Sequence, residues 1–313
     1  MSGRSAAARL DEVTPPAGAP QAPARITDLS ARRVRARRRY RLTVNVLRVL
    51  TAVLVLSVWE ITTSYHIGTA DANGVVPTIV DPFFWGQPSG IWHQLLVWFT
   101  EGTALGPLWE QVAVTMEETV GGFIVGTVLG VIVGVLLGRS RLLSDVFSIY
   151  IKAANAIPRV VLGALFAISL GLDLRSKIAT AAVLVFFVVF FNAFQGVREV
   201  ERNLIANARI LGADDRRLTT EIIIPSALSW ILASLHISFG LALVGAVVGE
   251  LFGATQGVGQ LIYNAEHTFN ANGVFAGMLL LATMALVAEA IITALENRLI
   301  KWRPPAMGSE VQI

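Results

Sequence analysis

The sequence contains a series of apolar stretches, each long enough to cross a lipid bilayer. A helix needs roughly 20 apolar residues to cross about 30 Å of hydrocarbon, where it satisfies its own backbone hydrogen bonds. The composition agrees, because 54% of the residues are hydrophobic and only 15% are charged. We place six spans, at residues 42–64, 111–138, 143–171, 178–196, 227–252 and 274–296. The sequence therefore predicts an all-α polytopic membrane protein.

Two of these stretches have internal features of their own. The third is too long for one straight crossing, so we expect an interfacial helix up to Asn155, a turn near Pro158 and then the crossing part. In the second, glycines recur every four residues and predict close helix–helix packing, with a pore-lining role as the alternative. These glycines are Gly122, Gly126, Gly130, Gly134 and Gly138. A Pro- and Trp-rich connection before residue 111 predicts a surface helix at the membrane boundary.

The distribution of Lys and Arg predicts the orientation. If both termini lie in the cytoplasm, twenty basic residues are cytoplasmic and only Arg175 and Lys177 lie on outer connections. Cytoplasmic loops are enriched in Lys and Arg, so we predict that both termini are cytoplasmic. We divide the chain into an Arg- and Pro-rich tail at 1–41, a first span with its outer connection at 42–110, a core at 111–303 and a tail at 304–313. We interpret residues 1–41 as a disordered anchor near anionic lipid rather than as a nucleic-acid-binding arm.

A polar segment at 197–226 interrupts the apolar core, and its 199–225 part reads EVERNLIANARILGADDRRLTTEIIIP. Apolar residues before Gly212 follow a helical stripe, and a glycine there can end the helix in a left-handed conformation. Asp214 or Asp215 can cap the next helix, and Pro225 is expected to break it before the fifth span. We therefore expect two short helices in a V with Gly212 near the apex; an amphipathic connector lying on the membrane is the alternative.

The spacing of this segment resembles the cytoplasmic "EAA" loop of ABC-importer permeases. Gly212, Ile222 and Pro225 match the family spacing, and Ile224 replaces the usual leucine. The family's Glu-Ala-Ala is replaced by Ala206, Asn207 and Ala208. Residues 245–263, which read GAVVGELFGATQGVGQLIY, and a basic W-R-P near the end resemble the sulfonate, nitrate and taurine branch of these permeases.

The resemblance implies a type I ABC-importer permease fold and a non-catalytic subunit in the bacterial cytoplasmic membrane. It also implies a second copy as a homodimer, two ATP-binding subunits that hold ATP and Mg, and a solute-binding protein. The substrate would be a small organic or inorganic anion, although the branch also handles neutral heteroaromatic nutrients. None of the three lysines follows a glycine, so a P-loop is missing from the chain and ATP must bind elsewhere. The expected coupling residues are Ala206, Asn207, Ala208, Gly212, Ala213, Asp214, Ile222, Ile224 and Pro225.

Polar residues within the spans are candidates for a gate or a translocation path. They are Asn155, Pro158, Asn192, His236, Ser238 and Glu250. Glu250 can act as a gate or as an anchor at the helix end, and His236 is more typical of a hydrogen-bonded packing residue. Lys152 and Arg159, seven residues apart, are expected on one helical face, where they attract an anion or snorkel to headgroups. Glu296 is expected to meet headgroups or Arg298.

Two other function classes are alternatives to the permease. An ion-coupled secondary transporter should have broken helices or paired intramembrane acids together with inverted repeats, and we identify none of these in the sequence. An intramembrane serine hydrolase would use Ser234 or Ser238 with His236, but the chain has no G-x-S-x-G elbow. The sequence therefore favours the permease, with the secondary transporter as the alternative.

Overall fold

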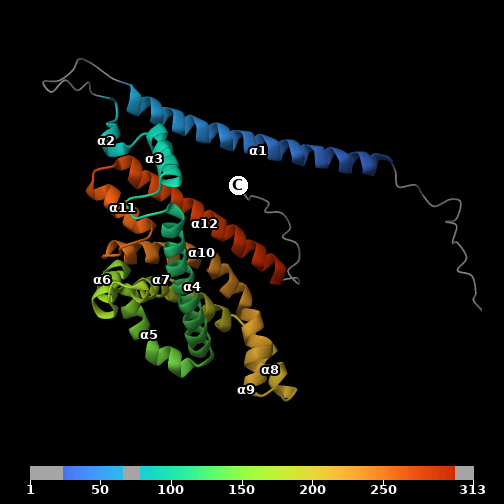
Figure 1. Cartoon of the computed structure of the whole chain (residues 1–313). Coiled ribbons are helices and arrows are strands. Elements are labelled where there is room, and N and C mark those ends of the chain that lie inside the picture. The colour runs from blue at the N-terminus through green and yellow to red at the C-terminus, as the bar shows by residue number, and fades with distance from the viewer. Residues whose placement is uncertain (1–23, 66–77, 300–313) are drawn as a thin grey trace, which may run out of the picture. The chain divides into compact units, whose positions relative to one another are not determined.

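The computed structural model describes residues 24–65 and 78–299, and the regular elements in these ranges are helices (Figure 1). The predictions for residues 1–23, for part of the outer connection and for the W-R-P ending and C-terminal tail lie outside the described residues. The chain divides into two compact units, Met1–Trp59 and Glu60–Ile313, which are described separately.

The first unit holds most of helix α1 (Ala24–Ser64). The prediction of a disordered tail up to residue 41 is wrong for residues 24–41, because α1 already begins at Ala24. Pro23 is the last proline before a run rich in Ala and Arg, and both residue types favour a helix. The membrane-competent part of this helix is Arg39–Ser64, in agreement with the first predicted span.

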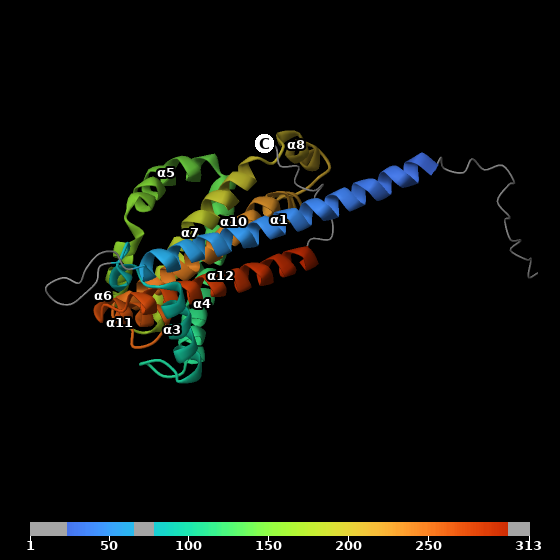
Figure 2. The same ribbon diagram turned by 90° about the horizontal axis from the view of Figure 1, so that it is seen from above.

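The described residues contain five helices long and apolar enough to span a membrane, or six if a bent pair counts as one span. The bent pair is α5 (Arg141–Ala156) and α6 (Arg159–Leu170), both labelled in Figure 2. The axes of these two helices differ by 88°. Pro158 is the N-cap residue of α6. The predicted turn near Pro158 is therefore confirmed, and the six predicted spans each coincide with a helix or with this pair.

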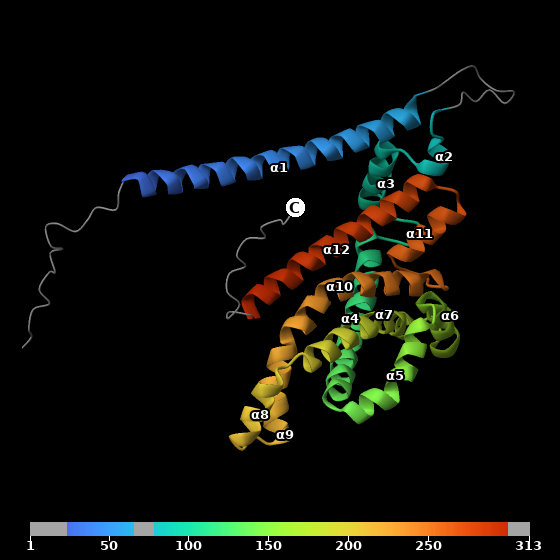
Figure 3. The same ribbon diagram turned by 180° about the vertical axis from the view of Figure 1, so that it is seen from behind.

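The core of the second unit is formed by α4 (Leu108–Arg139), α7 (Leu174–Arg198) and α10 (Ile224–Leu251), which lie side by side (Figures 1 and 3). The glycines of α4 face α7, and a Cβ atom added at Gly130 would lie 2.9 Å from the Cβ atom of Val189. Gly134 meets Ala193 in the same way one turn later. Along the interface, the residue numbers of the contacting positions increase in the same direction on both helices, so α4 and α7 are parallel. The predicted packing role of the glycines is confirmed.

One end of this bundle carries α2 (Pro82–Trp85), α3 (Pro88–Thr100), α11 (Val258–His267) and the start of α12 (Ala271–Leu299). The predicted surface helix is α3, on which Trp92 is exposed while Trp98 is buried. Asn272 Oδ1 accepts a 2.8 Å hydrogen bond from the backbone of Gln87, which ties the connection to α12. The opposite end carries α8 (Arg202–Ile210) and α9 (Asp215–Arg217), as Figure 3 shows. The polar segment and the outer connections are thus at opposite ends.

The predicted break at Pro225 is wrong. A π-helical turn, η1 (Leu218–Ile223), joins α9 to α10, and Asp215–Leu251 forms one continuous helix. Pro225 occupies the first turn of α10, and the amide of Ile224 bonds to the carbonyl of Thr219, five residues earlier. Proline cannot donate and its ring crowds the preceding turn. The wider π turn accommodates both effects, so the helix continues.

Candidate functional site

The apex of the polar segment is a helix C-terminus closed by glycine. After α8, the amide of Gly212 donates to the carbonyl of Arg209 and the amide of Ala213 donates to the carbonyl of Ala208, both at 3.0 Å. This pair of bonds is a Schellman motif with Gly212 in the position that needs a left-handed backbone, and its φ is +86°. Asp214 then caps α9 by accepting a 2.8 Å bond from the amide of Arg217. The turn and cap expected from the sequence are both present.

The apex presents apolar side chains to the surroundings. Ile210 is 83% exposed and Leu211 is 87% exposed, whereas a Cβ atom added at Gly212 would have nothing within 4 Å. Two adjacent large hydrophobic residues at such exposure, beside an open backbone, are typical of a surface that a partner covers.

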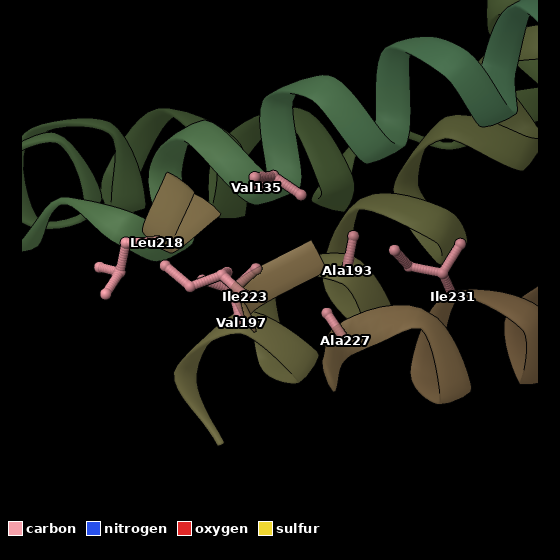
Figure 4. Packing of buried hydrophobic residues seen from close by; sticks show 7 residues of the cluster. All are labelled: Val135, Ala193, Val197, Leu218, Ile223, Ala227 and Ile231. Atoms are coloured by element: carbon pink, nitrogen blue, oxygen red, sulfur yellow. The ribbon is translucent and has the colours of Figure 1, made fainter. Parts of the chain in front are cut away.

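The root of the segment is packed into the bundle (Figure 4). Leu218 and Ile223 of η1 are almost fully buried and pack with residues from α4, α7 and α10. The buried cluster is Val135, Ala193, Val197, Leu218, Ile223, Ala227 and Ile231, and Ile205, Ala208 and Ile222 pack against it. An apex fixed to such a root can transmit a displacement into three membrane helices at once.

The nine predicted coupling residues therefore occupy three kinds of position. Gly212, Ala213 and Asp214 form the apex turn, and Ala208 and Ile222 pack at the root. The remaining four are exposed on the surface of the segment: Ala206, Asn207, Ile224 and Pro225. We refer to residues 199–225, the part of the polar segment that holds these predicted coupling residues, as the coupling segment.

The predicted path residues lie in separate places. At the bend between α5 and α6, Asn155 Oδ1 accepts a 2.5 Å bond from Arg159, whose guanidinium also lies 5.3 Å from the ring centroid of Phe187. Lys152 and Arg159 are on different helices separated by the 88° bend, so the expectation of one shared helical face is wrong. On α7, the Asn192 side chain donates to the carbonyl of Val188 in its own helix.

On α10, His236 joins two glutamates of α12. Its Nδ1 atom lies 2.6 Å from Glu289 Oε1 and its Nε2 atom lies 2.8 Å from Glu296 Oε2. An imidazolium satisfies both contacts by donating from each nitrogen. Glu296 therefore contacts His236 of α10, a partner that the sequence did not predict. Both ring nitrogens face carboxylates rather than a serine, so this geometry also argues against the serine hydrolase.

Two serines near His236 are buried in α10. The Ser234 hydroxyl donates to the carbonyl of Ile231 at 2.6 Å, within its own helix. Ser238 is fully buried, and its hydroxyl has no hydrogen-bond partner among the residues that the structure describes.

Glu250 lies in a buried polar cluster at the other end of α10. It is 0% exposed, accepts a 2.5 Å bond from the Thr115 hydroxyl of α4 and also accepts from the amide of Gly259 at the start of α11. Gln111 of α4 accepts a 2.8 Å bond from the amide of Gly257 in the same loop. These contacts tie the loop after α10 back to α4, which is the geometry of an anchor.

Four side chains of this cluster are absent from the predicted path residues: Gln111, Thr115, Glu118 and Lys177. Glu118 of α4 is 1% exposed, and its Oε1 atom lies 3.7 Å from the Lys177 ammonium. The signal was present, because Glu118 stands inside the second apolar span. Glu118 and Glu250 are acids buried on α4 and α10, and the α5–α6 pair is bent at a break. Buried intramembrane acids and a broken helix therefore both exist, contrary to the expectation that this chain lacks such features of a secondary transporter.

Comparisons with known proteins decide between these classes. Residues 126–301 match the family model described as "Binding-protein-dependent transport system inner membrane component". The chain is 30% identical over 254 residues to an aliphatic sulfonates transport permease protein, SsuC, of Bacillus subtilis, covering 81% of this chain and 86% of that protein. It is 33% identical over 204 residues to the riboflavin transport system permease protein RibX of Chloroflexus aurantiacus, covering 65% and 76%.

The fold has a counterpart among solved structures. A chain of the MetNI methionine ABC transporter, solved in inward-facing conformations, superposes with a TM-score of 0.51 at 21% identity, covering 60% of this chain and 95% of that one. The matched family model extends over more than half of the chain, including the coupling segment and the core helices α7 and α10. The chain therefore belongs to the binding-protein-dependent transport inner membrane components, and it is a multi-pass ABC transporter permease of the inner membrane.

Proposed function

We propose that this chain is the non-catalytic membrane subunit of an ATP-driven importer that moves a small solute into the cytoplasm by alternating access. Two copies would form the pathway, two separate subunits would bind ATP and Mg, and a solute-binding protein would deliver the solute. The observation that carries the proposal is the coupling segment, whose exposed apolar apex stands on a root packed against α4, α7 and α10. An ATPase subunit bound to the apex would move α4, α7 and α10 together when it changes conformation.

The solute we propose is a small anion of the sulfonate, taurine or nitrate type. The sulfonate permease SsuC, similar over most of this chain, supports that class. The similarity to a riboflavin permease makes a neutral heteroaromatic nutrient the second candidate. Uptake of labelled alkanesulfonate and of riboflavin, compared in host cells with and without the chain, discriminates the two classes. Loss of alkanesulfonate uptake alone is expected.

The predicted contact between the ATPase and the apex is tested with the variant Gly212→Trp. Affinity-tagged full-length chain is purified from its native membrane in mild detergent, and bound P-loop subunits are identified by mass spectrometry and by ATP hydrolysis. Gly212→Trp should abolish the ATPase association, because a bulky side chain on a backbone at φ +86° would both strain the turn and block the apex.

Gly171→Trp is the matched control. Gly171 also has a φ of +86° and nothing within 4 Å of an added Cβ atom, but it lies between α6 and α7, away from the coupling segment. This variant should retain the ATPase at the level of the unsubstituted chain. Loss of association in both variants would indicate general misfolding. Purification without any ATPase, together with uptake driven by an ion gradient, would overturn the importer and favour the secondary transporter.

A further inference from the structure

A cavity of about 560 Å³ lies between the coupling segment and the membrane helices that support it. Its walls come from the end of α4, the start of α5, the end of α7, and from α8 and η1. The ends of α4 and α7 mark the boundary between membrane-spanning helix and polar chain, at Arg139 and Arg198. The cavity is therefore at the depth where lipid headgroups lie.

The lining of this cavity is strongly basic. Four arginines contribute to it, and Asp215 is the one acidic residue in its lining. The four are Arg139, Arg141, Arg198 and Arg209. Arg139 and Arg141 flank the turn between α4 and α5, whereas Arg198 ends α7 and Arg209 belongs to α8. The tertiary structure therefore brings together arginines from three separate places in the chain.

The arginines are only weakly neutralised. Arg209 lies 3.5 Å from the Asp215 carboxylate, but the two side chains are 63% and 79% exposed, where an ion pair contributes little. Arg139 reaches the carbonyl of Asp215 at a long 3.4 Å. Arg198 stacks 5.2 Å from the Phe194 ring centroid and reaches the Ser144 hydroxyl at 3.3 Å. Guanidinium groups held this way retain donors for an anion.

The same cavity has an apolar side. Leu136, Leu143, Val197, Ile205 and Ile223 line it together with the arginines. Val197 and Ile223 also belong to the buried cluster beneath the coupling segment. A free inorganic anion would use only the arginines, whereas a phospholipid presents a phosphodiester and apolar chain carbons together. The mixed lining therefore fits a lipid better than a small ion.

We propose that this cavity is a binding site for a phosphate-bearing anion, and that its ligand is the headgroup of an anionic phospholipid. The phosphodiester accepts hydrogen bonds from the arginines, which suit phosphate oxygens because of their planar donor geometry. Since α8 and η1 form one wall, the bound lipid contacts the root of the coupling segment. The inference is independent of the proposed transport direction and solute.

The test measures binding of short-chain phosphatidylglycerol to the purified full-length chain. Melting temperature in detergent is followed during titration with dihexanoyl phosphatidylglycerol, with dihexanoyl phosphatidylcholine and with inorganic phosphate. The unsubstituted chain should show a saturable rise with phosphatidylglycerol only. The double variant Arg139→Gln with Arg141→Gln should weaken this binding roughly thirtyfold. Each arginine near the membrane surface contributes about 1 kcal/mol of attraction to anionic lipid, and a loss of about 1.4 kcal/mol weakens binding about tenfold.

The matched control is Arg216→Gln with Arg217→Gln, which removes the same charge from exposed residues of α9 that do not line the cavity. This control should bind as the unsubstituted chain does. Equal stabilisation by phosphatidylcholine, or equal weakening in both double variants, would overturn the site. A saturable phosphate response that depends on Arg139 and Arg141, without a stronger lipid response, would overturn the lipid and assign the site to a free anion.

If the Arg139 and Arg141 variant does not fold, the comparison of the three ligands on the unsubstituted chain still decides the outcome. Both substituted residues lie outside the coupling segment, at the turn between α4 and α5. A loss of lipid binding with ATPase association retained would therefore separate this site from the docking apex.

Discussion

At the residue scale, buried charged side chains make specific hydrogen bonds that a hydropathy profile does not reveal. Glu250 accepts from Thr115 and from the amide of Gly259, so removing its carboxyl leaves buried donors without a partner. We expect Glu250→Ala to lower the free energy of unfolding by about 3 kcal/mol, because unpaired buried groups are costly. The measurement is the melting temperature in detergent.

Glu266→Ala is the control for this prediction, because Glu266 is an exposed glutamate of neighbouring α11. It should melt as the unsubstituted chain does. If Glu250→Ala were equally stable but changed transport, the side chain would be a gate rather than an anchor.

His236 provides a second prediction at this scale. His236→Phe keeps a ring of similar size but removes the ring nitrogens that contact Glu289 Oε1 and Glu296 Oε2. We expect a loss of about 1–2 kcal/mol, since the three side chains are partly exposed. Adding Glu289→Gln and Glu296→Gln to this variant should recover most of the melting temperature. Failure of the triple variant to recover would mean that the ring packs and does not bridge charges.

At the element scale, the contact between α4 and α7 depends on glycine because the backbones approach closely. A Cβ atom at Gly130 would lie 3.0 Å from both the carbonyl oxygen of Phe186 and the amide of Phe190, which are backbone atoms that cannot rotate away. We therefore expect Gly130→Ala to cost about 1–3 kcal/mol through overpacking, measured as a lower melting temperature.

Gly240→Ala is the matched comparison, because Gly240 is a helical glycine of α10 with nothing within 4 Å of an added Cβ atom. That variant should be neutral or more stable by up to about 1 kcal/mol, from helix propensity alone. Equal effects of the two substitutions would contradict the close packing of α4 on α7.

At the scale of the whole molecule, the orientation in the membrane is open to a direct test. The chain has no cysteine, so a single introduced cysteine reports its own position. Asn203 is exposed in α8, and Thr268 is exposed after α11, at the opposite end of the bundle. In intact cells, a membrane-impermeant maleimide should label Thr268→Cys but label Asn203→Cys only after permeabilisation.

The reverse labelling pattern would place the coupling segment outside the cell and contradict the predicted orientation. Labelling of both positions in intact cells would indicate that the reagent enters the cells. The control is a cytoplasmic protein with an exposed cysteine, which must stay unlabelled in intact cells. This assay tests orientation independently of any ATPase.

Features that depend on local or periodic signals could be predicted from the sequence. Apolar length predicted the spans, the four-residue recurrence of glycine predicted the α4 face, and Gly212 with Asp214 predicted the apex turn and its cap. In each case the physical cause acts within a few residues, through bilayer thickness, helix period or backbone conformation. The break expected at Pro225 failed because a π turn relieves the clash that proline creates.

Which polar groups meet could be learned from the folded structure alone. Glu250 and Thr115 are 135 residues apart in sequence, and His236 and Glu296 are 60 apart. Likewise, four arginines from separate elements form one cavity. A single sequence contains no signal that pairs such distant positions. Their contacts follow from how α4, α7, α10 and α12 pack, and buried charge then requires that each group find a partner.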